Sequence, residues 1–146
     1  MTAPAHIPRI SRADYDDLAP AAVAALRALG KAVDDSGLEK TLTELIKIRA
    51  SQINGCAFCI QFHLNMARKL GVEAAKLDLL AAWRETGVYS ERERAALAWT
   101  EALTRMGRHS VTDTAWTQLQ SQFSRSEIAF LTTSIGTINA WNRIAG

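Results

Sequence analysis

From about residue 20 onward, apolar residues recur every three or four positions, the spacing of helices that bury one face. No segment alternates apolar and polar residues over the length of a useful strand. All three prolines lie within the first twenty residues, so none interrupts the rest of the chain. Alanine and leucine, both strong helix formers, are abundant. The pattern predicts an all-α protein, a single-domain bundle of about six to seven helices.

Turn-forming and capping residues divide this pattern into segments. Residues 1–19 are expected to form an N-terminal arm with one turn around Tyr15, and residues 20–146 the helical domain. Serine and glutamate three residues apart form the capping-box pattern twice, at Ser90 and at Ser124. We expect helices over residues 20–33, 38–53, 56–70, 73–85, 90–105, 112–123 and 124–143.

Composition and charge narrow the class of protein. The 146 residues are 48% hydrophobic and 22% charged, as in ordinary globular domains. A net charge of +2 gives no reason to expect nucleic acid or a membrane as partner. The longest uncharged run, 128–142, is too short and polar to span a bilayer, and no signal peptide pattern opens the chain. We therefore expect a cytoplasmic protein, in which two cysteines are not a structural disulfide framework.

The densest group of reactive side chains lies in residues 54–63, which contain both cysteines. At roughly 100° per residue, Cys56, Cys59 and His63 share one face of the expected helix 56–70. The unpaired N–H groups of a helix start favour thiolate over thiol, and a thiolate is the nucleophile toward peroxides and disulfides. Because the imidazole lies one turn from Cys59, it can exchange a proton with that thiol. The cluster therefore favours a redox dithiol.

Two other interpretations of the cluster remain open. The two cysteines could be inert packing residues of a core stripe. Alternatively, Cys56, Cys59 and His63 could bind zinc together with a carboxylate. The second ligand pair expected for such a site is missing, since the other histidines are His6 and His109 and have no partners in sequence. We therefore expect no metal.

The segment also resembles a known family. A glutamate, Glu44, is followed twelve residues later by Cys-x-x-Cys, and the second cysteine is followed four residues later by a histidine. This signature is similar to that of the AhpD-like alkylhydroperoxidases of the carboxymuconolactone decarboxylase superfamily. Residues 45–56 and the closing segment 138–143 resemble that family too. The resemblance covers the chain from about residue 20 to its end.

The resemblance implies an all-helical fold, assembly into trimers or hexamers, and thiol-dependent reduction of hydroperoxides. By analogy, Cys59 would become the sulfenic acid and Cys56 would be the proton donor and resolving thiol, while Glu44 and His63 would form a proton relay. The founding members carry a histidine immediately before the second cysteine, where this chain has Phe58. Helix-dipole reasoning alone favours Cys56 as the more acidic thiol. We follow the resemblance, since His63 lies one turn from Cys59.

The position of Glu44 on its helix supports two interpretations. Glu44 lies opposite the apolar stripe and beside Lys40 and Lys47, which by itself is typical of a solvated carboxylate. Ile48 lies on the same polar side, where an exposed isoleucine would be unusual. We therefore predict that this face packs against the cysteine helix or against a neighbouring subunit.

The leading hypothesis is a peroxidase of the AhpD-like type that reduces hydroperoxides through Cys56 and Cys59. No Gly-x-Gly-x-x-Gly motif follows a strand, so we expect no flavin or nicotinamide cofactor. The electrons must then come from an external thiol or dithiol protein. The alternatives are a redox-sensing or structural helical oligomer without catalysis, and a lactone decarboxylase, whose chemistry does not need a thiol pair.

Overall fold

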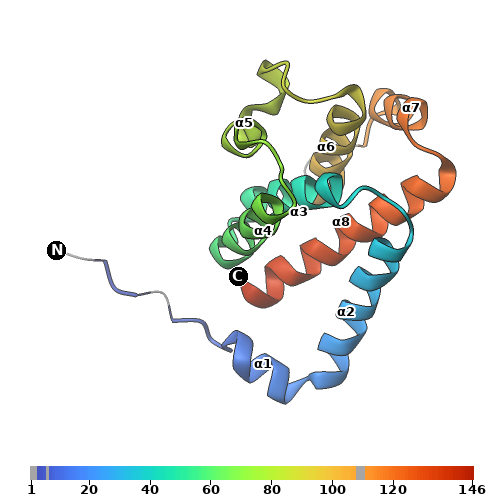
Figure 1. Ribbon diagram of the computed structural model, residues 1–146. Helices are drawn as coiled ribbons and strands as arrows, with labels where there is room; N and C mark the ends of the chain where they lie inside the picture. Colours follow the sequence, from blue (N-terminus) through green and yellow to red (C-terminus); the bar gives the residue numbers. More distant parts are fainter. Residues whose placement is uncertain (1–2, 6, 108–110) are drawn as a thin grey trace.

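The computed structural model describes residues 3–5, 7–107 and 111–146, and the regular structure in these ranges is entirely helical (Figure 1). This confirms the predicted all-α fold. The elements are α1 (Arg12–Leu18), α2 (Pro20–Asp35), α3 (Lys40–Asn54), α4 (Ala57–Lys69), α5 (Ala74–Asp78), the 3-10 helix η1 (Leu80–Glu85), α6 (Glu91–Thr104), α7 (Asp113–Gln122) and α8 (Arg125–Ala145).

Most helix ends lie within a few residues of their predicted positions, because the capping signals act locally. Ser90 and Ser124 each accept a hydrogen bond from the backbone N–H three residues on, and Glu93 and Glu127 return one, so both capping boxes are formed. Gly55 ends α3 in the left-handed conformation, with φ 71°. A side chain is strained at such a φ, which is why glycine stands there.

Two segments differ from the sequence prediction. Residues 12–18, placed in the N-terminal arm with one turn around Tyr15, form the seven-residue helix α1, which Ser11 caps. The single helix expected over 73–85 is instead α5 followed by η1, with a kink at Ala82. The buried residues of this stretch are Leu77 in α5 and Leu80 and Trp83 in η1. The three-residue spacing of Leu80 and Trp83 matches the period of a 3-10 helix, which keeps both side chains on the core.

Helix α3 lies at the centre of the fold and packs against α4, α6 and α8 (Figure 1). Its side chains enter two separate apolar clusters. Leu42 and Ile46 join the cluster with α6, α7 and α8, whereas Leu45 and Ile48 join the one with α4, α5 and η1. Because both faces are covered, the residues between the two apolar stripes are buried as well, polar ones included.

A buried ion pair joins α3 to α6. Arg49 donates from Nε and Nη2 to one carboxylate oxygen of Glu101, at 3.0 and 2.8 Å. Arg84 of η1 pairs with the other oxygen. Glu101 is 5% exposed, and burial raises the pKa of its carboxyl, but the hydrogen bonds from Arg84 and Arg49 outweigh burial and lower it. The carboxylate therefore remains charged in the core.

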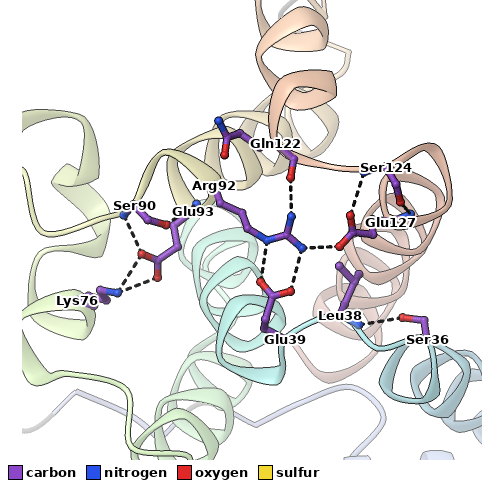
Figure 2. A network of polar contacts seen from close by, with 10 residues as sticks. All are labelled: Ser36, Leu38, Glu39, Lys76, Ser90, Arg92, Glu93, Gln122, Ser124 and Glu127. Carbon is purple, nitrogen blue, oxygen red and sulfur yellow. Dashed lines mark hydrogen bonds and ion pairs between the residues drawn. The ribbon is translucent and has the colours of Figure 1, made fainter.

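Arg92, in the first turn of α6, connects this helix to α3, α7 and α8 (Figure 2). Its guanidinium binds both carboxylate oxygens of Glu39, at the start of α3, each at 2.8 Å. It also donates to the backbone carbonyl of Gln122 and to Glu127 of α8. This planar arrangement of donors holds the first turns of α3, α6 and α8 together.

We expect Glu101→Gln to lower the free energy of unfolding by roughly 3 kcal/mol, because Arg49 would keep a buried charge without a carboxylate. The pKa of Glu101 is lowered from its usual 4.5 by folding, so its contribution is present above pH 4.5 and is lost as the pH falls through the lower folded value. Urea unfolding of both proteins across that range should show the stability difference shrinking in acid. Glu91→Gln, on the exposed start of α6, is the control and should change stability by less than about 0.5 kcal/mol. An equal effect of the two substitutions would contradict this account.

Candidate functional site

The corner between α3 and α4 positions the two cysteines. After Gly55 turns the chain, the Cys56 N–H donates to the carbonyl of Ser51 at 3.0 Å, which closes the end of α3. Cys56 is also the N-cap of α4, and its sulfur accepts the backbone N–H of Cys59 at 3.3 Å. Cys56 thus takes part both in the turn that closes α3 and in the start of α4.

The two sulfurs are bonded to each other in this structure, with 5.3 Å between the Cα atoms of Cys56 and Cys59. Such a separation is ordinary for disulfides. The sequence prediction that these sulfurs lie close enough to bond is therefore confirmed. Both residues are buried, Cys56 at 1% and Cys59 at 3% exposure.

Glu44 faces α4 and is buried against it. Its Oε2 lies 2.7 Å from Nδ1 of His63, and its Oε1 accepts from Lys47 Nζ at 3.3 Å. Ile48, on the same side of α3, is fully buried. The prediction that this face packs against the cysteine helix is confirmed, and the cover comes from the same chain. This face therefore does not by itself require a second subunit.

The charge state of Glu44 follows from its surroundings. Burial raises the pKa of its carboxyl, but the hydrogen bond from His63 and the positive charge of Lys47 together outweigh burial, so the pKa is lower than usual. A carboxylate accepts hydrogen bonds, so a neutral His63 donates Nδ1–H to it and keeps Nε2 as the acceptor. The pair thus orients the imidazole.

A cavity of about 300 Å³ opens beside the disulfide. Cys59 and His63 line it, whereas Cys56 is absent from its wall. Phe58 and Phe62 of α4 also line it, at 54% and 50% exposure. A molecule entering from this side therefore reaches the Cys59 sulfur first. The remaining lining residues come from α1, α2, α3 and α8: Arg12, Arg27, Gly30, Val33, Lys47, Ser134, Thr137, Ile138, Trp141 and Ala145.

A polar network that the sequence analysis did not assign holds α8 against the cysteine corner. The Asn54 amide donates to the side-chain oxygens of Asn139 and Asn142, both at 2.9 Å. Asn142 in turn donates to Ser51 Oγ at 2.9 Å. The carbonyl oxygen of Trp141 thereby lies 3.9 Å from Cys59 Sγ. The asparagines at 139 and 142, three residues apart on one helix, were the available signal.

Two of the three histidines cannot be placed against this site, since His6 and His109 lie outside the described residues. Within the described ranges, no cluster of three or more histidine, cysteine, aspartate or glutamate side chains is arranged to hold a metal. None of the helices in the same ranges combines the length and apolar character that a bilayer span requires.

Known families and proteins resemble this chain over the region that contains the site. The family model described as the carboxymuconolactone decarboxylase family matches residues 20–102, which contain Glu44, both cysteines and His63. The uncharacterized protein YdfG of Bacillus subtilis (strain 168) is 37% identical over 134 residues, which cover 92% of this chain and 91% of that protein.

Solved structures extend the comparison to the fold. A protein of unknown function from Agrobacterium tumefaciens, described as a candidate antioxidant defence protein AhpD, is 44% identical, with a TM-score of 0.87 and 92% of each chain covered. An uncharacterized peroxidase-related protein from Silicibacter sp. TM1040 is 24% identical, with a TM-score of 0.74 over 84% of this chain and 65% of that one. At this identity, the second likeness shows the shared fold alone.

We expect the neutral His63 to carry its proton on Nδ1, because that nitrogen faces the Glu44 carboxylate. Nitrogen NMR of the neutral imidazole reports the tautomer. In Glu44→Gln the amide can donate or accept, so both tautomers should be populated. Glu85→Gln, on the exposed end of η1, should leave the spectrum unchanged. A wild-type spectrum with the proton on Nε2 would contradict the assigned pairing.

Proposed function

The chain belongs to the carboxymuconolactone decarboxylase family, and we propose that it is an AhpD-like, thiol-dependent peroxidase that reduces hydroperoxides through Cys56 and Cys59. One observation carries the proposal. Cys59, one half of the bonded pair, lines a cavity together with His63, whose imidazole Glu44 orients. A nucleophile, a base and an entry path thus meet in one place.

The proposed reaction starts from the reduced dithiol. His63 Nε2 takes the proton of the Cys59 thiol, and the Cys59 thiolate attacks the terminal oxygen of the hydroperoxide. The O–O bond breaks, Cys59 becomes a sulfenic acid, and the departing alkoxide takes this proton from the His63–Glu44 pair and leaves as the alcohol. Cys56 then attacks the Cys59 sulfur, water departs, and the disulfide forms. The peroxide thereby gains the two electrons that the two thiols lose.

The positions of the two sulfurs support different roles for the two cysteines. Cys59 lines the cavity, which supports it as the residue that meets the peroxide. Cys56 lies behind it, where its sulfur accepts the N–H of Cys59 at the first turn of α4. A backbone N–H at a helix start stabilises a thiolate, so this place suits a resolving thiol, and a leaving group during reduction. Helix-dipole reasoning favours Cys56 as the more acidic thiol, and this acidity therefore matters in the second step, when Cys56 attacks the Cys59 sulfur.

The proposal includes an electron donor and an assembly. A small thiol or a dithiol protein would reopen the disulfide by attack on Cys59, the sulfur that lines the cavity. We place the reaction in the cytoplasm, where such thiols keep cysteines reduced. The family resemblance further implies a trimer or hexamer. Light scattering at working concentration separates these assemblies from the 16.0 kDa monomer.

We expect Cys59→Ser to abolish peroxide turnover and to retain helix content, because it removes the attacking sulfur and changes one atom. Cys56→Ser should accumulate the Cys59 sulfenic acid, which dimedone traps and mass spectrometry locates. Serine is a preferred N-cap residue, so Cys56→Ser keeps the start of α4. In the wild type, stoichiometric peroxide should remove two protons and link Cys56 to Cys59.

The competing functions give different results for the same variants. If the cysteine pair is structural or redox-sensing, Cys59→Ser should lower stability, and the wild type should show no peroxide turnover with excess reductant. If the protein is a lactone decarboxylase, it should turn over a lactone substrate, and both cysteine variants should retain that activity. Retention of peroxide turnover in Cys59→Ser would rule out the assignment made here.

We expect His63→Gln to lower kcat/KM for hydroperoxides by about a hundredfold or more, the usual contribution of a positioned acid or base. The disulfide should still form slowly, because the thiols remain. Gln61→Ala, on the exposed side of α4, is the matched control and should retain the wild-type rate. Stopped-flow reduction of peroxide by the pre-reduced proteins measures both, and equal rates in His63→Gln and the wild type would remove the relay from the mechanism.

A further inference from the structure

The cavity extends well beyond the reacting sulfur. One of its walls is a face of α8 that carries Ser134, Ile138 and Trp141. The carbonyl of Trp141 lies 3.9 Å from Cys59 Sγ, but Ser134 stands seven residues (141 minus 134) earlier in the same helix. That is two helical turns, about 10 Å along the axis. A hydrogen peroxide molecule at Cys59 would leave this part of the cavity empty.

The hydroxyl of Ser134 is buried without a partner. Ser134 is 2% exposed, and its Oγ has no hydrogen-bond partner among the described residues. A serine inside a helix ordinarily bonds the carbonyl four residues earlier. Thr133 and Thr137 beside it do so, at 2.9 and 2.7 Å. A buried unpaired hydroxyl costs about 1–3 kcal/mol, which an acceptor oxygen on a bound molecule would offset.

Gly30 of α2 lines the same cavity and is unexplained by the fold. It lies inside a 16-residue helix and is not among the glycines with positive φ. A Cβ built on it meets nothing within 4 Å. Alanine there would favour the helix by about 1 kcal/mol. Neither the backbone nor close packing therefore requires glycine, and its missing side chain leaves the cavity wider.

From these observations we propose that the cavity binds hydroperoxides with an extended apolar body and a neutral acceptor oxygen, and that the Ser134 hydroxyl recognises this oxygen. An ester, ketone, ether or hydroxyl group would serve. A neutral acceptor is favoured because the wall beside Ser134 is apolar through Val33 and Ile138, where burying a charge is costly, although Arg12, Arg27 and Lys47 line the cavity too. Gly30 leaves room for the carbon chain. The proposal rests on the proposed peroxidase function and narrows its substrate class.

The first test compares two medium-chain aliphatic hydroperoxides that differ only at the far end, one with a terminal methyl ester and one with a methyl group. We expect Ser134→Ala to lower kcat/KM for the ester about three- to tenfold, the value of one hydrogen bond, and to leave the other substrate unchanged. Ser121→Ala, on the exposed side of α7, is the control. Equal effects on both substrates, or on neither, overturn the recognition by Ser134.

The second test fills the cavity. Gly30→Leu should lower kcat/KM for both long substrates by roughly tenfold or more, because the added side chain occupies the space of the carbon chain. Its kcat/KM for hydrogen peroxide should stay within about twofold of the wild-type value. Gly136→Leu, a glycine inside α8 on its exposed side, is the matched control for the change in helix propensity. Loss of hydrogen peroxide turnover in Gly30→Leu, or full retention of the long substrates, contradicts the proposal.

Equilibrium binding separates failure of this inference from failure of the proposed function. The corresponding alcohols, with and without the ester, do not react and can be titrated into the disulfide form by calorimetry. The ester alcohol should bind more tightly, and Ser134→Ala should remove that preference. If the wild type reduces no peroxide, the peroxidase proposal fails, and this titration still decides the recognition. Equal affinities for the two alcohols overturn it.

Discussion

The arrangement of the site depends on the enclosure of one helix, α3, on both of its long sides. Two apolar clusters use different stripes of this helix, so the polar residues between the stripes are forced into the interior. A carboxylate can remain charged there only with close donors, and Glu44 has His63 and Lys47. The same packing of α3 against α4 that satisfies Glu44 orients the imidazole on the cysteine helix. Core packing and the geometry of the site therefore have one cause.

The disulfide pair combines a structural and a chemical role. Cys56 ends the turn after α3 and caps α4, so its sulfur must lie at a helix start. Cys59 follows within the first turn and contacts the α8 backbone, which the asparagine network holds in place. Cys59 lines the cavity, whereas Cys56 is not part of its wall. Two sulfurs that are chemically alike thus have different surroundings, which supports a division of roles between them.

Local signals made much of the fold predictable. The capping boxes at Ser90 and Ser124 and the stop at Gly55 each involve residues within a few positions of one another, and the structure confirms all three. The prediction of a single helix over 73–85 is wrong, because the apolar spacing of this stretch fits a helix of either kind; in the structure α5 ends at Asp78, and Leu80 and Trp83 are buried from the 3-10 helix η1. The proximity of Cys56, Cys59 and His63 was predictable too, since it needs nothing beyond helical periodicity.

The sequence by itself thus determined most of the helices, the shared face of the two cysteines with His63, and the family signature around them. Tertiary structure decided which surfaces meet. On its own helix, Glu44 has the pattern of a solvated residue, and its burial arises from α4, a separate segment of the chain. The cavity walls of α2 and α8, with Gly30 and the unpaired Ser134, were likewise invisible in sequence. Periodicity describes one helix at a time, whereas burial, ion pairing and cavities depend on contacts between residues far apart in the chain.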